Sequence, residues 1–232
     1  MAEHTSKQFD AELESVRSRV LHMGGMVEQQ ITRAMEALIS GDMDLIEKTI
    51  ADDHRVNALE VELDESCSHI IARRQPAAGD LRLLITVIKT ITDLERIGDE
   101  AEKIARMAKL IHSAGRMHMP RMDLSNVADR ALAMLRQSLD AFARLDVSEA
   151  MAVVRQDSAV DDQFRAIMRQ LITFMMEDPR TITRSLEILF IAKAIERIGD
   201  HSKNMAEYVI YMAKGRDVRH VSLDEMEKEI LE

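Results

Sequence analysis

The chain has 232 residues, enough for one or two domains with substantial hydrophobic cores. Only 8 Gly, 3 Pro and 3% aromatic residues accompany 17 Met and 31% charged residues, a composition that favours helices and argues against a β-rich fold. A net charge of −10 repels phosphate backbones and anionic lipid headgroups, which argues against nucleic acid as a partner and against direct membrane contact.

Helical periodicity extends over most of the chain and is interrupted at a few turn-forming positions. The pattern predicts a first helix from near Thr5 to Gly41 and Asp42. A second helix ends before Gln75 and Pro76, and a third ends near residue 112, at the Ser-Ala-Gly segment 113–115. These three helices form one triplet.

A second triplet follows a linker over residues 116–121. Its first helix opens at Asp123 and ends near Asp146, and Asp178 with Pro179 separates the remaining two helices. The last helix ends around Lys214 and Gly215, and a short helical pattern over 223–231 follows in a charged tail.

The two triplets are copies of one unit, because the segment Glu-Arg-Ile-Gly-Asp occurs at both 95–99 and 196–200. An offset of 104 residues relates Asp53 to Asp157 and Asn57 to Asp161, and an offset of 101 relates Glu95 to Glu196 and Asp99 to Asp200. We therefore predict an all-α fold of two tandem three-helix bundles. The expected parts are a first bundle in 1–115, a linker in 116–122, a second bundle in 123–215 and a charged tail in 216–232.

The repeated segment lies where one face of the third helix changes from apolar to acidic. Leu84 and Ile88 lie in line with Glu95 in the first half of the helix, and Asp99 and Glu102 follow in the second half. An apolar stripe continues beside them, so the acids flank a packed surface. The sixth helix repeats this scheme.

Carboxylates four residues apart lie one helical turn from each other and repel, so we expect cations beside Glu95 and Asp99 and beside their repeats Glu196 and Asp200. Such oxygen ligands suit magnesium, manganese, calcium or ferric iron. The second and fifth helices add pairs with the same spacing, and in an antiparallel bundle these pairs can face the first. They are Asp53 with Asn57 and Asp157 with Asp161.

The same acids also fit ordinary solvated or salt-bridged positions, since Asp99 can pair with Lys103 and Asp200 with Lys203. Glycine inside a helix costs about 1 kcal/mol relative to alanine, so Gly98 and Gly199 indicate close approach of a neighbouring helix. Arg96 and Arg197 point away from the acids, and we expect them to hold neighbouring helices by salt bridges.

At these residues the sequence resembles the PhoU family, bacterial regulators of phosphate uptake and signalling. The likeness covers nearly the whole chain and rests on the tandem repeat and on both Glu-Arg-Ile-Gly-Asp segments. The resemblance implies a non-enzymatic, usually dimeric protein, with metal ions or clusters on its acidic faces in some members. It further implies negative regulation of phosphate uptake and of the phosphate-starvation response, through contacts with the ATPase of a phosphate ABC transporter and a membrane sensor histidine kinase.

Carried over residue by residue, the family's acidic pattern predicts metal ligands in both repeats, the ion being Fe, Zn, Mn or Mg. The second repeat fits fully, with Asp157, Asp161, Glu196, Asp200, Asn204 and Glu207, and the first supplies Asp53, Asn57, Glu95 and Asp99. In the first repeat Asn57 replaces an acid, while Lys103 and Arg106 bring positive charge toward Glu95 and Asp99. We therefore predict that the second bundle binds metal more strongly.

Two other functions compete with this interpretation. A carboxylate-bridged di-iron enzyme needs Glu-x-x-His pairs, and none of the 8 histidines follows a Glu by three residues. A metal-independent helical adaptor, with acidic faces that dock basic partners, stays open. Met23, Met26, Met117, Met119 and Met122 are interpreted as core filling rather than partner contacts.

The lone Cys67 fits a reducing compartment and is expected to be a small buried or half-buried side chain. The amino terminus has no basic stretch followed by an apolar run, and the longest apolar runs fall far short of the roughly 20 residues that span a bilayer. We therefore expect a cytoplasmic protein that meets the membrane only through partners. His54 and His201 are both expected to be exposed helical residues.

Overall fold

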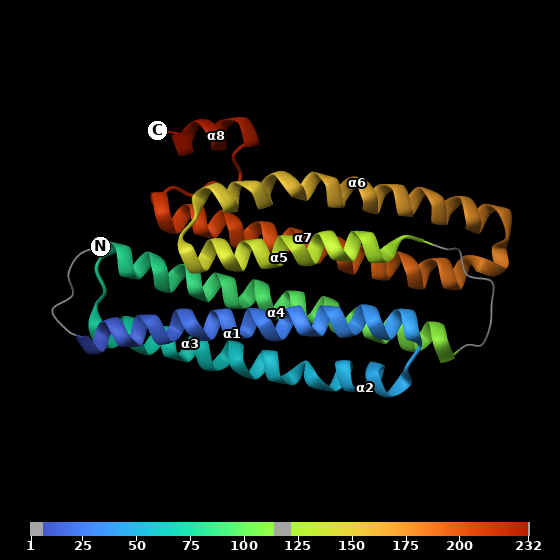
Figure 1. The fold of residues 1–232 in the computed structure, drawn as a ribbon, viewed down its shortest axis with the longest axis horizontal. Coiled ribbons are helices and arrows are strands. Elements are labelled where there is room, and N and C mark those ends of the chain that lie inside the picture. The colour runs from blue at the N-terminus through green and yellow to red at the C-terminus, as the bar shows by residue number, and fades with distance from the viewer. Residues whose placement is uncertain (1–6, 114–121, 232) are drawn as a thin grey trace.

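The structure, a computed structural model, describes residues 7–113 and 122–231. Within these ranges all regular structure is helical, which confirms the predicted all-α class (Figure 1). Most of the predicted linker 116–122 lies outside the described residues, as do Thr5, Met117 and Met119.

The first bundle contains α1 (Lys7–Ser40), α2 (Met43–Asp52), α3 (His54–Arg74) and α4 (Ala78–Ser113). Helices α2 and α3 follow one another along the underside of α1 and α4 in Figure 1. The sequence predicted a single second helix here, and the interruption at Asp53 corrects that prediction.

Local hydrogen bonding explains the interruption. The amide of Val56 donates to the carbonyl of Asp53 at 2.9 Å, a tighter i to i+3 bond, and Nδ1 of His54 lies 2.5 Å from the carbonyl of Ala51. A side chain that occupies a backbone carbonyl disturbs the regular hydrogen-bond ladder. Asp53 itself keeps helical torsion angles of −58° and −38°, so the helix direction changes little.

The second bundle contains α5 (Leu124–Arg144), α6 (Val147–Glu177) and α7 (Ile182–Lys214), with a short 3₁₀ turn, η1 (Pro179–Thr181), between the last two. Helix α8 (Leu223–Leu231) follows and packs against α6. Its range matches the short helical pattern in the tail.

Tight turns reverse the chain direction between α1 and α2 and between α5 and α6 (Figure 1). At the end of α1, Gly41 has a positive φ of 69° and its amide donates to Ala37, while the carboxylate of Asp42 accepts from the amide of Asp44 at 3.0 Å to cap α2. Asp146 caps α6 in the same way, accepting from the amide of Glu149 at 3.0 Å.

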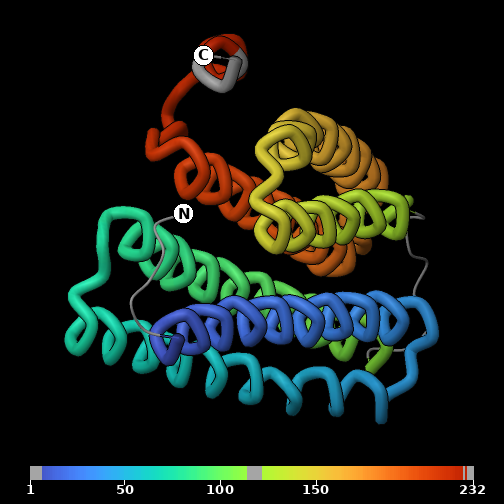
Figure 2. The backbone as a smooth tube through the Cα atoms, turned by 60° about the vertical axis from the view of Figure 1, so that its left-hand side comes forward, coloured from blue at the N-terminus to red at the C-terminus, as the bar shows by residue number. Residues whose placement is uncertain are grey.

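The two bundles pack through α4 and α7, which lie at the centre of the molecule (Figure 2). Arg184 of α7 donates to the carbonyl of Leu110 on α4 at 3.1 Å, and further along Arg197 pairs with Glu100 at 2.9 Å. Residue numbers therefore fall along α4 as they rise along α7, so these two repeated helices are antiparallel. The repeats are thus related by an approximate two-fold axis, and one apolar core runs through both.

Close helix approach at the two repeated glycines is confirmed. A Cβ on Gly98 would lie 3.4 Å from Oδ1 of Asp53 and 3.5 Å from Val56, and a Cβ on Gly199 would lie 3.4 Å from Val160. The duplicated pentapeptide thus brings α3 close to α4 and α6 close to α7, which positions the acidic residues of each bundle.

Candidate metal centre and bundle interface

Three predicted ligands converge in the second bundle. Asp161 on α6 and Glu196 and Asp200 on α7 offer carboxylate oxygens that all lie within 4.8 Å of one another. Among the described residues this is the one such group of three His, Cys, Asp or Glu side chains. Spacing along the helices and antiparallel packing therefore combine to make a compact acidic site.

The charge in this site is incompletely balanced. Burial, with the negative charges of Glu196, Asp157 and Asp161, raises the pKa of Asp200 to about 6, and Lys193 only partly opposes this. Among the described residues, the Asp200 carboxylate has neither a hydrogen-bond nor an ion-pair partner. A cation would remove this repulsion.

The acidic ridge of the second bundle comprises Asp157, Asp161, Glu196 and Asp200, and two lysines already neutralise part of it. Lys193 donates to both oxygens of Glu196, at 2.6 and 2.5 Å, and Lys203 donates to Asp157 at 2.7 Å. The sequence suggested Lys203 as a partner of Asp200, and the structure pairs it with Asp157 on α6 instead. A metal ion bound at this site would have to compete with Lys193.

The remaining two predicted ligands of the second repeat lie further along α7. Burial raises the pKa of Glu207 to about 7, against the positive charge of Lys203 and with support from the charge of Asp157. Nδ2 of Asn204 lies 3.4 Å from Oδ1 of Asp93 on α4, so this amide faces the other bundle.

In the first bundle the corresponding ridge is built differently. Asp53 is buried, and its two carboxylate oxygens accept from Gln30 at 2.8 Å and from Asn57 at 3.1 Å. The other amide oxygens, Oε1 of Gln30 and Oδ1 of Asn57, are buried without a hydrogen-bond partner among the described residues. Unsatisfied buried acceptors are rare, and here they adjoin a carboxylate.

Glu95 and Asp99 also lack charge balance. Burial is the main cause that raises the pKa of each, the charge of Asp53 adds to it, and Arg96 opposes it. Arg96 is exposed and forms no ion pair with a described residue, whereas Arg197 forms the predicted salt bridge, with Glu100.

The cations that distinguish the first repeat have their own partners. Lys103 pairs with Glu100 at 3.2 Å and Arg106 pairs with Glu102 at 2.5 Å. They therefore do not neutralise Glu95 and Asp99 directly, which corrects part of the reasoning behind the expected difference between repeats.

The acidic residues of both bundles fit a hard cation, but the two bundles offer different ligand groups. The second repeat supplies converging carboxylates, with Asp161, Glu196 and Asp200 as the residues that would hold the ion. The first supplies buried amide oxygens beside Asp53, with Glu95 and Asp99 on the adjoining helix. Neither set contains a thiolate, so oxygen-preferring ions fit best.

The prediction that His201 is exposed is wrong, because His201 belongs to a buried polar cluster between the two bundles. His201 is only 8% exposed, and its Nδ1 lies 2.7 Å from Oδ1 of Asp93. The hydroxyl of Tyr208 also hydrogen-bonds to Asp93, and burial with this charge raises its pKa above the usual range. His54 is exposed, as predicted, and Cys67 and Met23 are buried as predicted.

Sequence patterns missed Asp93 and Gln30. Asp93 interrupts the apolar face of α4 between Ile91 and Leu94, and Gln30 interrupts that of α1 before Ile31. A buried polar side chain requires a partner, so these interruptions were the available signal. The partners come from other helices, which periodicity within one helix does not reveal.

The described chain is thus a protein of two tandem helical bundles related by two-fold symmetry, with an acidic ridge in each. The family model described as PhoU domain matches twice, at residues 20–108 and 124–209. The chain belongs to the PhoU family, as the resemblance indicated.

Individual relatives agree over almost the full length. The chain is 49% identical over 226 residues to the phosphate-specific transport system accessory protein PhoU of Escherichia coli (strain K12), covering 97% of this chain and 93% of that protein. It is 45% identical over 230 residues to the PhoU homolog of Pseudomonas aeruginosa, covering 99% and 95%. The crystal structure of PhoU from Pseudomonas aeruginosa superposes with a TM-score of 0.86 at 46% identity, covering 90% of this chain and 100% of that one.

In the described ranges, no helix combines the length and the apolar character that a transmembrane span requires.

Proposed function

We propose that this protein is an accessory regulator of phosphate-specific transport, which restrains phosphate uptake and the phosphate-starvation response. One observation carries the proposal: the chain matches, over 97% of its length, a relative whose name describes an accessory protein of the phosphate-specific transport system. The proposed mode of action is contact with the transporter ATPase and with a membrane sensor histidine kinase, in the cytoplasm, as a homodimer and without enzymatic activity.

The acidic ridges support a contact that depends on cations. Asp99 is exposed and Asp200 is half-buried, so both carboxylates reach solvent beside the α4 and α7 face. We propose that Fe, Zn, Mn or Mg ions bind there and balance the charge that raises the pKa of Asp200. In the metal-independent alternative, Lys193 and Lys203 provide the balance and the free acids meet basic partner surfaces directly.

Affinity purification from phosphate-replete cells tests the proposal. The unmodified protein is expected to recover the transporter ATPase and the sensor kinase, and a variant with Glu95, Asp99, Glu196 and Asp200 replaced by Ala is expected to lose them. A matched control removes the same charge at four exposed acids outside the ridges, Glu36, Asp64, Asp129 and Glu177, and should keep both partners.

Chelation separates the two modes of contact. Loss of the partners in the presence of a chelator indicates metal-dependent contact, while unchanged recovery indicates the metal-independent adaptor. Failure of the unmodified protein to recover either partner contradicts the regulatory function.

A further inference from the structure

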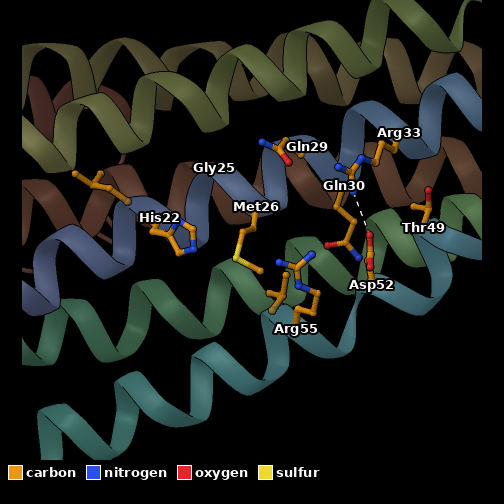
Figure 3. A pocket seen from close by; sticks show the side chains of 11 residues that line it. His22, Gly25, Met26, Gln29, Gln30, Arg33, Thr49, Asp52 and Arg55 are labelled. Atoms are coloured by element: carbon orange, nitrogen blue, oxygen red, sulfur yellow. Dashed lines mark hydrogen bonds and ion pairs between the residues drawn. The ribbon is translucent and has the colours of Figure 1, made fainter. Parts of the chain in front are cut away.

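A polar pocket lies on the outer side of the first bundle, between α1 and the α2 and α3 segment. Its volume is about 410 Å³, within the range of small-molecule sites. Figure 3 shows His22 on α1 pointing toward α3 and Arg55 reaching toward α1 from α3, and Gln29 of α1 is also among the lining residues. Thr49 of α2 also lines the pocket.

The pocket has an excess of positive charge in a chain whose net charge is −10. Arg33 pairs with Asp52 at 3.1 Å, so these two charges compensate each other. Arg55 is exposed and forms neither a hydrogen bond nor an ion pair with a described residue. The pocket thus has one guanidinium group free to bind an anion and a second fixed beside it.

Gly25 keeps the pocket open. It lies in the interior of the 34-residue helix α1, where glycine costs about 1 kcal/mol relative to alanine. A Cβ built on Gly25 meets no atom within 4 Å, so no neighbouring helix requires glycine here, in contrast to Gly98. Space beside this position is therefore open to a ligand.

The second repeat shows that the pocket belongs to the first repeat alone. Gly98 approaches Gln30 and Val56, and Gly199 approaches Met134 and Val160, so an offset of 104 residues also relates α1 to α5. At this offset Gly25, Arg33, Asp52 and Arg55 correspond to Asp129, Gln137, Gln156 and Ala159.

These differences remove each feature of the pocket. An acid replaces the glycine, both arginines are lost, and Nε2 of Gln156 donates to Oε1 of Gln137 at 2.7 Å where Arg33 and Asp52 form an ion pair. The common scaffold therefore does not need the arginines or the glycine at these positions. The glycine and the arginines therefore occur in the first repeat alone.

We propose that this pocket binds the phosphate group of a small molecule, either inorganic phosphate or a phosphate monoester. Arginine matches the geometry of phosphate oxygens, and the amide of Gln29 supplies a further donor. Leu21, Met26 and Val56 provide an apolar side for the remainder of an ester. This site goes beyond the proposed regulatory function, and its test involves neither transporter nor kinase.

Calorimetric titration of metal-free protein in a chelator tests the site, because metal in the acidic ridges would itself bind phosphate. The probes are inorganic phosphate, AMP and adenosine. We expect saturable binding of phosphate or AMP and none of adenosine. Tighter binding of AMP identifies an ester as the ligand, and equal or tighter binding of inorganic phosphate identifies the free ion.

Two variants locate the binding. Arg55→Gln removes the free guanidinium and should weaken binding about tenfold or more, since hydrogen bonds to charged groups contribute about 1.5–3 kcal/mol. Gly25→Leu should abolish binding by filling the pocket, while the melting temperature stays at least as high because leucine favours helix.

Matched controls are Arg169→Gln, an exposed arginine on α6, and Gly79→Leu, which also has no atom within 4 Å of a built Cβ. Both should bind like the unmodified protein. The proposal is overturned if neither phosphate nor AMP binds, if adenosine binds as tightly as AMP, or if binding is unchanged in Arg55→Gln and Gly25→Leu.

Discussion

His201 on α7 and Asp93 on α4 form a buried contact between the two bundles, with Nδ1 and Oδ1 2.7 Å apart. Asp93 also accepts from Asn204 and Tyr208, so one carboxylate serves three polar groups of the other bundle. A buried group of this kind is costly to leave without its partners.

Replacement of Asp93 by Ala is therefore expected to destabilise the protein by about 2–3 kcal/mol, because His201 and Tyr208 lose a charged acceptor. Urea unfolding followed by circular dichroism measures the change. Asp64→Ala, at an exposed position of α3, should stay within about 0.5 kcal/mol of the unmodified protein. Equal effects of the two substitutions would show that the cluster does not stabilise the interface.

Asp200 predicts a pH dependence of stability in metal-free protein. Its pKa rises from 3.8 to about 6 on folding, so the folded state binds more protons between these values, and stability falls as pH rises from about 4 to about 6 and is level above. Asp200→Asn should therefore be more stable at pH 7.5, on the order of 2 kcal/mol after allowance for partial exposure.

This advantage should vanish below about pH 4, where the carboxyl is protonated in both states. Thermal melts across pH in a chelator measure it, and Asp162→Asn, at an exposed acid beside the ridge, is the control. A stability difference that does not change with pH would contradict the assigned cause.

The two ridges are expected to differ in metal affinity. Asp200→Ala removes one of three converging carboxylates, whereas Asp99→Ala removes an exposed one, so the first substitution should cause the larger loss of bound metal. Elemental analysis of purified proteins dialysed against one ion at a time measures the content. Equal losses in the two variants would refute the asymmetry.

The repeated glycines should respond differently to alanine. Gly199→Ala meets only ordinary contacts, the nearest at 3.4 Å, and should gain about 0.5–1 kcal/mol from helix propensity. Gly98→Ala places a Cβ 3.2 Å from Oε1 of Gln30 and disturbs the bond of that side chain to Asp53, with an expected loss of about 1 kcal/mol. Thermal melts of the two variants measure these changes in stability. A gain of stability in both variants would contradict the tighter packing of the first repeat.

Cys67 should be chemically inert in the native protein. Burial raises the pKa of its thiol to about 11 and the side chain has no exposed surface. A thiol reagent at pH 8 should therefore label it at least a hundredfold more slowly than in denaturant. Rapid labelling of the folded chain would indicate local opening of α3.

Periodicity and turn residues were sufficient to predict the helices other than the division between α2 and α3, the repeat, and the close approach at Gly98 and Gly199. They describe the face that a residue occupies on its own helix. The position of His201 could not be predicted in this way, because its burial depends on α4, more than one hundred residues away in the sequence. The break between α2 and α3 involves the tightened bond from Val56 to Asp53 and the contact of the His54 ring with Ala51, which periodicity does not reveal.

In the candidate site, too, features within one helix could be predicted and contacts between helices could not. The sequence identified Asp161, Glu196 and Asp200, because their spacing and repetition are local features. Pairing of Lys203 with Asp157 depends on the relative height of α6 and α7, which single-helix patterns leave open. The pocket around Arg55 likewise needs the distance between α1 and α3.

The antiparallel packing of α4 against α7 has a directional consequence. A perfect two-fold would give both sides of the axis through this central pair of helices the same contacts. Here Glu100 and Lys103 on α4 stand where α7 has His201 and Asn204, so the buried contacts on the two sides of the axis differ: Glu100 pairs with Arg197, whereas His201 contacts Asp93. The seam between the bundles is therefore not interchangeable end for end, although the two helices that form it are repeats of one another.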